Sequence, residues 1–492
     1  MVRSEWSIGA GRCLAVLVVF LAGLGAGRGD EPARRPVNVV VVLVDDMGWN
    51  DLSCQGSTFH RTPHIDRLAA SGTRFTHGYA ACPVCSPTRA ALLSGQWPAR
   101  LHVTDWIAGH EVPGARLTIP DWTKHLPLEV VTVAERLKGA GYATATIGKW
   151  HLGGEGFGPE RQGFDTNHGG TARGQPPTYF SPYEIPTLTD GPPGEYLTDR
   201  EAAEAVAFIE RNHDRPFFLY LPHHAVHTPL EAKAEAERRW IDAGGKPDRE
   251  ARKGLRVGGD TGPGQVNATY AAMVGSVDDS VGRIVAALEG LSLSDSTAIV
   301  FTSDNGGLLP VTDNRPLRAG KGSAYDGGVR VPLIVSWPGV TPPGTTSDEP
   351  AITPDIAATI LDLTGVGPEP GQPLDGTSLA PALAGGRLDR HAIYWHYPHY
   401  HPGGATPFSA IRAGDWRLVR FHETGHDELY DLREDPGERV DRAKSDPSRA
   451  AGLARDLDAW LAETGAQMPT PNPAWKPAPA PSADAGPAGG AR

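Results

Sequence analysis

The sequence predicts an α/β fold, with a large, doubly wound, mostly parallel sheet flanked by helices and a smaller C-terminal subdomain with an antiparallel sheet. Three observations support this prediction. The β-branched run at 37–48 is continuous rather than alternating, which is typical of a parallel strand covered on both faces. Similar runs alternate with helical patterns as far as residue 307, which indicates a doubly wound sheet. From about residue 389 the pattern changes to short strands and turns.

Each expected element has a local signal. The segment 63–72 begins with proline and ends with glycine, which suits the two ends of a helix, and 130–142 is a second helix of similar plan. The other expected elements are helices at 200–212, 266–290 and 448–463 and strands at 143–148, 216–227 and 297–307.

The chain divides into four predicted regions. Residues 1–28 are predicted to be a signal peptide, because Arg3 and Arg12 precede an apolar stretch at 13–27 that is short for a membrane span. A membrane anchor is the alternative. Export would place the protein in the periplasm or outside the cell, without stable membrane insertion after cleavage. The other regions are a catalytic α/β domain at 36–388, the small subdomain at 389–466, and a Pro/Ala/Gly-rich tail at 467–492 that is expected to be disordered.

Charge and cysteine content exclude some classes of protein. The formal net charge of -12 argues against a general nucleic-acid binder and requires a local basic pocket for any anionic substrate. Cys13 would leave with the signal peptide, so the mature chain would keep Cys54, Cys82 and Cys85, an odd number that does not suggest a disulfide framework. The charged, glycine-rich segment 231–265 indicates a surface excursion that could act as a lid.

Polar residues stand where predicted strands end. Asp45, Asp46, His227, Asp304 and Asn305 occupy such positions, and ligands bind beyond the carboxyl ends of strands in sheets of this kind. We therefore expect them to converge. The oxygen donors among them favour Ca²⁺ or Mg²⁺ over zinc. Taken alone, "DDMG" would more simply be a pair of capping or solvated carboxylates, but its pairing with "SDNGG" at another strand end favours a metal site.

The stretch "CPVCSPTRAALLSG" at 82–95 allows three interpretations. A zinc ribbon lacks its second cysteine pair. A thioredoxin-like pair leaves Pro87 and Arg89 unexplained. The third frame is C-x-P-x-R, with Cys85 at a helix N-terminus that favours an anion, Pro87 in the first turn and Arg89 one turn later.

In this third frame the chain resembles the type I, formylglycine-dependent sulfatases of the alkaline phosphatase superfamily. C-x-P-x-R followed by "AALLSG" is a specific motif of that family. Further segments resemble family segments in the family order, and the resemblance spans about residues 37 to 465: "VVLVDDMGWNDLSCQGS", "GYATATIGKWHLG", "FFLYLPHHAVHTPL", "FTSDNGG" and "LRAGKGSAYDGGVRVPLIVSWPG".

The resemblance implies a nucleophile and a metal. A formylglycine-generating enzyme would oxidise Cys85 to Cα-formylglycine. One hydroxyl of the hydrated aldehyde would attack sulfur, and loss of a proton from the other would release sulfate. One Ca²⁺ would be held by Asp45, Asp46, Cys85, Asp304 and Asn305. Asn305 also discriminates against two-zinc phosphatases of the superfamily, which usually have a histidine there.

The resemblance also assigns roles to basic residues. Besides Arg89, the implied catalytic residues are Lys149, which would contact the nucleophile and the sulfate, and His151, which would take a proton during aldehyde regeneration. His227 and Lys321 would bind sulfate and help to protonate the leaving oxygen.

Candidate substrate residues follow from weaker signals. The segment 396–404 resembles one that approaches the active-site mouth in part of the family, although its histidines and aromatic residues could equally pack the small subdomain onto the large one. The candidates are His168, His224, His396, His399 and His401. His223 is expected to be structural or to line the pocket, Arg330 to be structural, and Asp355 and Asp375 to be cap and turn residues.

The leading hypothesis is therefore an exported sulfatase that acts on sulfated carbohydrates. The alternatives are a phosphodiesterase or phosphonate monoester hydrolase with the same nucleophile, and a non-catalytic polysaccharide-binding relative.

Overall fold

The protein is described by a computed structural model that covers residues 37–255 and 262–476. The predicted signal peptide lies outside the described residues. The described residues belong to one compact unit, which contains both the predicted catalytic domain and the small subdomain. Within the described ranges, no helix combines the length and the apolar character needed to cross a bilayer.

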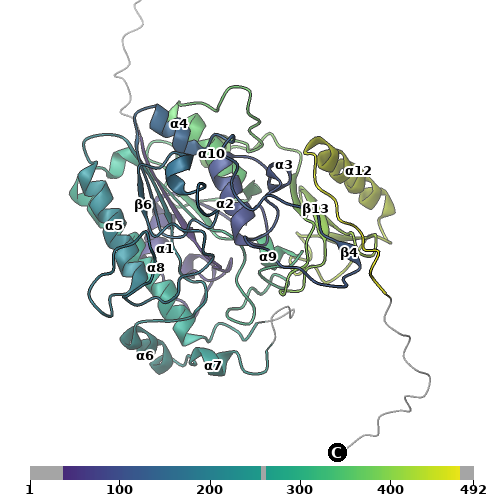
Figure 1. Cartoon of the computed structure of the whole chain (residues 1–492), viewed down its shortest axis with the longest axis horizontal. Coiled ribbons are helices and arrows are strands. Elements are labelled where there is room, and N and C mark those ends of the chain that lie inside the picture. The colour runs from purple at the N-terminus through teal and green to yellow at the C-terminus, as the bar shows by residue number, and fades with distance from the viewer. Residues whose placement is uncertain (1–36, 256–261, 477–492) are drawn as a thin grey trace, which may run out of the picture. The chain divides into compact units, whose positions relative to one another are not determined.

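An eight-stranded sheet forms the centre of this unit (Figure 1). The prediction of a mostly parallel sheet is confirmed, with β9 as the antiparallel member between β2 and β8. In sheet order the strands are β10 (Thr345–Ser347), β2 (Thr73–Phe75), β9 (Leu333–Ser336), β8 (Thr297–Ser303), β1 (Asn38–Val44), β7 (Phe217–Pro222), β5 (Ala143–Ile147) and β6 (Thr166–His168).

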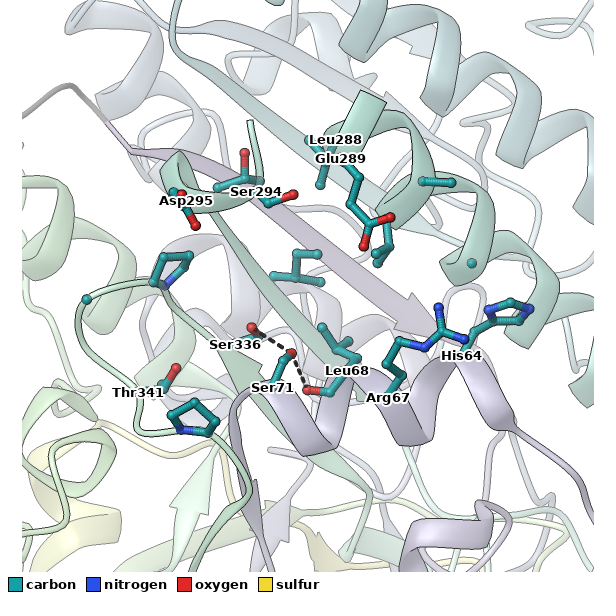
Figure 2. A pocket seen from close by; sticks show the side chains of 18 residues that line it. His64, Arg67, Leu68, Ser71, Leu288, Glu289, Ser294, Asp295, Ser336 and Thr341 are labelled. Carbon is teal, nitrogen blue, oxygen red and sulfur yellow. Dashed lines mark hydrogen bonds between the residues drawn. The ribbon is translucent and has the colours of Figure 1, made fainter. Parts of the chain in front are cut away.

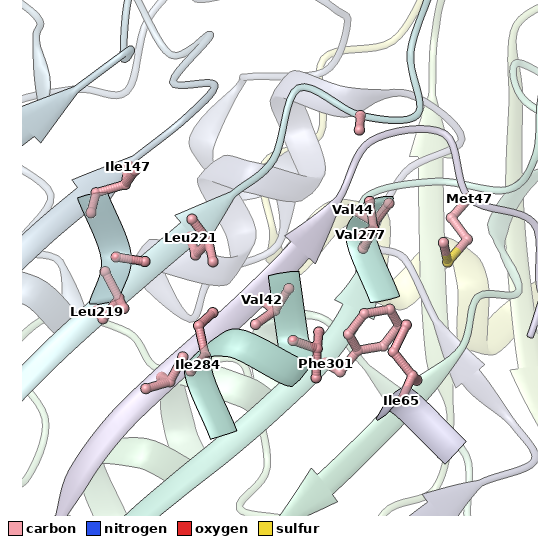
Figure 3. Close-up of a cluster of buried hydrophobic side chains, with 14 of the residues drawn as sticks. Val42, Val44, Met47, Ile65, Ile147, Leu219, Leu221, Val277, Ile284 and Phe301 are labelled. Atoms are coloured by element: carbon pink, nitrogen blue, oxygen red, sulfur yellow. The ribbon is translucent and has the colours of Figure 1, made fainter. Parts of the chain in front are cut away.

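Helices cover both faces of the sheet, which explains why β1 is apolar at every position after Asn38. Val40, Val42 and Val44 face one core, while Val39, Val41 and Leu43 alternate with them into the other. The first core contains α1 (Pro63–Ser71), α5 (Leu197–Arg211) and α8 (Ala268–Gly290), and Figure 3 shows Val42 and Val44 beside Ile65, Val277 and Ile284 of these helices. The second contains α2 (Cys85–Ser94), α4 (Val133–Gly139), α10 (Pro354–Thr364) and α11 (Ala380–Leu383).

The predicted small antiparallel sheet is also present. Its order is β12 (Ile393–Tyr397), β13 (Phe408–Ala413), β14 (Trp416–Phe421) and β15 (His426–Asp431), and α12 (Pro447–Glu463) packs against it (Figure 1). The core of this sheet is shared with the large part of the chain, because Tyr79, Val84 and Val329 belong to the same apolar cluster as its strands. A pair of two-residue strands, β3 (Gly78–Tyr79) and β11 (Ala351–Ile352), lies at this junction.

Two surface segments differ from expectation. Part of the proposed lid at 231–265 forms α6 (Ala234–Asp242) and α7 (Asp248–Ala251), which contact α8. The prediction of disorder from residue 467 is wrong for its first part. There, β16 (Thr470–Pro471) pairs with β4 (Leu117–Thr118), and the Arg116 guanidinium lies 5.4 Å from the Trp475 ring centroid. This pairing is non-local and has no signal in the composition of the tail.

Candidate active site

Strand ends bring the predicted acidic residues together at one edge of the sheet. β1 and β8 are parallel neighbours, so Asp45 and Asp46 emerge beside Asp304 and Asn305. The Asp46 backbone N–H donates to Asp304 Oδ1 at 3.2 Å, and Asn305 Nδ2 donates to Asp46 Oδ1 at 2.9 Å. Asp46 adopts a left-handed conformation with φ of 65°, a strained state of the kind that often marks functional positions. The expected convergence of these residues is therefore observed.

The nucleophile candidate lies at the start of a helix, as predicted. Cys85 is the first residue of α2, and no side chain caps that end. The first backbone N–H groups of a helix lack intrahelical acceptors and carry partial positive charge, so they favour an anion at this position. Every residue of α2 is buried, which fixes the position of Cys85.

Arg89 connects the helix to the acidic cluster. Its Nε and Nη2 both donate to Asp304 Oδ2, at 2.9 and 2.7 Å, and its Nη1 donates to the carbonyl oxygen of Lys149 at 2.9 Å. Arg89 and Asp304 are both fully buried. A buried ion pair of this geometry holds the helix and the ends of β8 and β5 in register.

Two lysines balance the other aspartates. Lys149 Nζ lies 2.6 Å from Asp45 Oδ2, and Lys321 Nζ lies 2.6 Å from Asp46 Oδ1. Three carboxylates thus face three cationic side chains, so the fixed charges of the cluster cancel: Asp45, Asp46 and Asp304 against Arg89, Lys149 and Lys321.

Three buried oxygens in this cluster have no hydrogen-bond partner among the residues that the structure describes: Asp45 Oδ1, Asp46 Oδ2 and Asn305 Oδ1. Leaving such atoms unsatisfied is costly, and their coordination of a cation would remove the cost. Burial and the Asp304 carboxylate raise the pKa of Asp45 well above its usual value, so the ionised carboxylate of Asp45 is costly in this buried position. An all-oxygen set suits a hard cation such as Ca²⁺.

The imidazole of His151 is oriented toward the nucleophile candidate. Its Nε2–H donates to the carbonyl oxygen of Ile107, which can only accept, and its Nδ1 lies 3.3 Å from Cys85 Sγ. Burial and the Lys149 charge lower the pKa of His151 well below its usual value. The ring is therefore neutral, with a lone pair on Nδ1 facing position 85. His151 also has a positive φ of 57°.

His227 faces the same cluster from the end of β7. Its Nε2 lies 3.7 Å from Asp46 Oδ2, and its ligand atom groups with those of Asp45 and Asp46 within 4.8 Å. Nδ1–H donates to the carbonyl oxygen of Thr228 at 2.8 Å. Burial lowers the pKa of His227 to about 3, so the neutral ring presents a lone pair at Nε2.

The five candidate substrate histidines separate into one near the site and four with other partners. His401 packs on Gly322, and both Lys321 and Asp46 influence its pKa, which burial lowers to about 3. The prediction for His396 is wrong, because its two nitrogens are taken by Ser409 Oγ and the carbonyl oxygen of Gln467. The prediction that His399 contacts the substrate is also wrong, because its side chain is fully buried and its Nε2 lies 2.8 Å from Thr104 Oγ1.

The remaining two histidines face α5. His168 Nε2 lies 3.6 Å from Glu204, and His224 Nδ1 lies 2.6 Å from the buried Glu201. His223 binds the other oxygen of Glu201, also at 2.6 Å, as expected for a structural residue.

The residues expected to be structural are so. Arg330 donates to the carbonyl oxygen of Thr76 and pairs with Asp326, while Asp355 and Asp375 accept from backbone N–H groups. Sequence reasoning missed Ser86, whose hydroxyl donates to the His151 carbonyl oxygen and accepts from the Ile107 N–H. Its position inside C-x-P-x-R was the available signal, whereas the Ile107 carbonyl has none.

A separate cavity of about 580 Å³ lies at the opposite edge of the sheet from the acidic cluster, that is, at the other ends of the central strands (Figure 2). Thr297, the first residue of β8, and Ser336, the last of the antiparallel β9, both line it, whereas the acidic cluster follows the other end of β8. Glu289 and Asp295 also line this opposite-edge cavity.

Comparison with known proteins supports the same assignment of family and fold. The sulfatase family model matches residues 37–366, and the model for the C-terminal part of N-sulphoglucosamine sulphohydrolase matches residues 320–466. N-acetylgalactosamine-6-sulfatase of Sus scrofa is 35% identical over 417 residues, covering 77% of this chain and 72% of that protein. Human arylsulfatase A is 34% identical over 491 residues, covering 88% and 86%.

Solved structures agree with these matches. The crystal structure of Ps i-CgsB superposes with a TM-score of 0.72 and 30% sequence identity, covering 87% of this chain and 93% of that one. The same protein has been solved in complex with k-i-k-neocarrahexaose, with the same similarity to this chain.

Proposed function

The chain belongs to the sulfatase family and is a sulfuric ester hydrolase, and from this premise we propose that it is an exported enzyme that removes sulfate from carbohydrates, using formylglycine made from Cys85 and one bound Ca²⁺. The observation that carries the proposal is the set of three unpartnered buried oxygens at the strand ends. They lie in a cluster whose Arg89 and Lys321 also interact electrostatically with Cys85 at the start of α2.

Calcium would be held by Asp45, Asp46, Asp304, Asn305 and the modified side chain at position 85. When bound, Ca²⁺ would polarise a sulfate oxygen and orient the nucleophilic hydroxyl. The donor set supports one hard cation rather than two zinc ions, because Asn305 is a poor zinc ligand.

Sulfate binding would fall to the cationic side chains. Lys149 and Lys321 each bring one ammonium group to the acidic cluster, 2.6 Å from an oxygen of Asp45 and of Asp46 respectively. With both lysines balanced by aspartates, a bound Ca²⁺ would leave the pocket positive and so attract an anionic ester against the chain's net charge of -12.

Proton transfers would be divided between two positions. His151 Nδ1 carries a lone pair toward position 85, which suits acceptance of the proton that must leave when the aldehyde is regenerated. At the leaving oxygen, neutral His227 offers no proton at Nε2, because Nδ1 holds the ring proton against Thr228. Lys321 is therefore the better proton donor there, and His227 the better sulfate-positioning residue.

A carbohydrate substrate is supported by the relatives. Curated relatives include N-acetylgalactosamine-6-sulfatases, and Ps i-CgsB has been solved with a carrageenan-type hexaose. We place the enzyme in the periplasm or outside the cell on the basis of the signal-like residues 1–28, with a formylglycine-generating enzyme as its maturation partner. A phosphonate monoester hydrolase with the same nucleophile is the second candidate, and matched sulfate and phosphonate esters distinguish the two.

Substitution of the nucleophile tests the mechanism. Cys85→Ala should abolish turnover of 4-nitrophenyl sulfate, whereas Cys82→Ala, which removes a neighbouring buried thiol, should retain turnover. Peptide mass analysis of the wild type should show a loss of about 18 Da at position 85, the difference between a thiol and an aldehyde side chain. Full activity of Cys85→Ala, or an unmodified thiol in active enzyme, would refute the proposal.

Removal of the metal tests the cation. Chelation should raise KM as well as lower kcat, because the side chains alone leave the pocket neutral, and Ca²⁺ should restore both. Activity unchanged after exhaustive chelation contradicts a bound cation.

A further inference from the structure

We infer that a second cavity beside the active site binds the sugar unit next to the sulfated one, and that it selects an uncharged unit over a uronate or a second sulfate. This inference rests on the proposed function. The cavity, here called the loop cavity, has a volume of about 450 Å³, and its lining includes Glu111, Leu117, Asp121, Trp122, Tyr400 and Asn472.

Two chain segments connect the loop cavity to the active site. In the first, the Ile107 carbonyl oxygen accepts from His151, and Glu111, four residues later, already lines the loop cavity. Between them, a Cβ atom on Gly109 would lie 2.9 Å from the Trp122 ring, so the backbone passes directly over this wall.

The second connection runs through the C-terminal subdomain. A Cβ atom on Gly322 would lie 1.8 Å from His401 Nδ1, so the His401 ring packs against the residue that follows Lys321. Its neighbour Tyr400 lines the loop cavity. Burial lowers the pKa of His401, and the charges of Lys321 and Asp46 at the site and of His110 in the first segment also act on it. Both connections place walls of the loop cavity within a few residues of groups that contact the active site.

The walls are fixed before a ligand arrives. β16 pairs with β4 beside the cavity, Asn472 Nδ2 donates to the Ala115 carbonyl oxygen at 2.8 Å, and the Tyr400 hydroxyl accepts from the Leu117 N–H at 3.1 Å. The early part of the C-terminal tail thus closes one wall. Preformed walls reduce the entropy lost on binding.

The chemistry of the lining selects the occupant. Apolar groups of Leu117, Trp122 and Tyr400 suit the C–H faces of a pyranose ring. Glu111 and Asp121 carry carboxylates for which the described residues provide no hydrogen bond or ion pair. Lys124 also lines the loop cavity, with its Nζ 5.7 Å from the centroid of the Trp122 ring, so the lining carries two carboxylates against one ammonium and a net negative charge. Two free carboxylates accept hydrogen bonds from neutral hydroxyls and repel a second anion.

The test uses inhibition of 4-nitrophenyl sulfate hydrolysis by the wild-type, formylglycine-bearing enzyme. The inhibitors are two sets of sulfated disaccharides that cover the same sulfate positions and differ only in the neighbouring unit, a neutral hexose in one set and a hexuronate in the other. The neutral set should give an inhibition constant about fivefold lower, as expected for one like-charge contact near a solvated surface. The double variant Glu111→Gln/Asp121→Asn should abolish this ratio.

A matched double variant provides the control. Glu289→Gln/Asp295→Asn makes the same charge change in the opposite-edge cavity and should keep both the aryl sulfate turnover and the fivefold ratio. Equal inhibition by the two sets, stronger inhibition by the uronate set, or inhibition by neither set would overturn the inference while aryl sulfate hydrolysis remained intact. Absence of all sulfate ester hydrolysis would instead overturn the proposed function.

Discussion

The carboxylate of Glu201 should be one of the most important single groups for stability. It lies on α5, is 1% exposed, and binds His223 Nδ1 and His224 Nδ1 through separate oxygens, each at 2.6 Å. Burial alone would raise its pKa, but the hydrogen bonds from the two histidines lower it from 4.5 to about 2. A folded pKa below the unfolded one means that the ionised group stabilises the folded state above about pH 4.5 and that this contribution is lost as pH falls toward 2.

The size of the effect follows from the shift. About 2.5 pKa units correspond to roughly 3.4 kcal/mol at neutral pH, falling to about 1.4 kcal/mol at pH 3. Glu201→Gln should therefore lower the free energy of unfolding by about 3 kcal/mol at pH 7.5, because one amide cannot accept from both imidazoles. The assay is urea denaturation at pH 7.5 and pH 4. Glu204→Gln on the same helix is the control, since Glu204 is partly exposed and pairs with Arg200 one turn away, and it should cost about 0.5 kcal/mol. A cost for Glu201→Gln no larger than that of the control would refute the reasoning.

Three further predictions concern other parts of the fold. Gly148→Ala should lower both Tm and kcat/KM, because its Cβ would lie 2.1 Å from the last carbonyl oxygen of β7. The control is Gly141→Ala, also at positive φ but with no atom within 4 Å of the added Cβ, which should lower the free energy of unfolding by only about 1 kcal/mol and leave kcat/KM unchanged. Burial raises the pKa of Asp105 from 3.8 to about 7, so the protonated carboxyl stabilises the folded state at low pH and this contribution is lost as the pH rises. In denaturant titrations, the free energy of unfolding of the wild type should fall by up to about 4 kcal/mol relative to that of Asp105→Asn between pH 4 and pH 8. Glu438→Ala should lower the free energy of unfolding by about 3 kcal/mol, because it removes the buried acceptor of Arg417 Nη1 at 2.6 Å and of the Asp326 N–H at 2.7 Å, and leaves Arg417 only Asp326 as a carboxylate, at 3.2 Å. A loss below about 1 kcal/mol in urea titrations would contradict this.

The fold was predictable because its main signals are local and continuous. β1 is apolar at six successive positions since both faces of the sheet are covered, and that continuity can be read directly from the sequence. β16 was not predictable, because two residues in a Pro/Ala/Gly-rich tail form a strand only when β4 is beside them. Composition describes what a segment would do alone, whereas pairing depends on a distant partner.

Part of the site was predictable from the order of the strands rather than from local signals, and part of it was not predictable. Asp45 and Asp304 follow adjacent parallel strands, so topology alone brings them together. Strand topology did not determine the positions of the candidate substrate histidines. His396 lies in β12 and His399 lies just beyond it, and both turn inward to protein partners, which depends on packing that the sequence does not display.

The charge balance of the cluster connects its stability to its chemistry. Three aspartates at a buried sheet edge would repel one another strongly, and Arg89, Lys149 and Lys321 cancel that repulsion. The cancellation offsets this repulsion, yet it leaves Asp45 Oδ1, Asp46 Oδ2 and Asn305 Oδ1 without a hydrogen-bond partner among the described residues. Under the proposed function, the lysines that neutralise the aspartates would become available to an anionic ester when a divalent cation binds the carboxylates. The pocket's affinity for sulfate is thus expected to depend on the bound cation rather than on the net charge of the chain, which is -12.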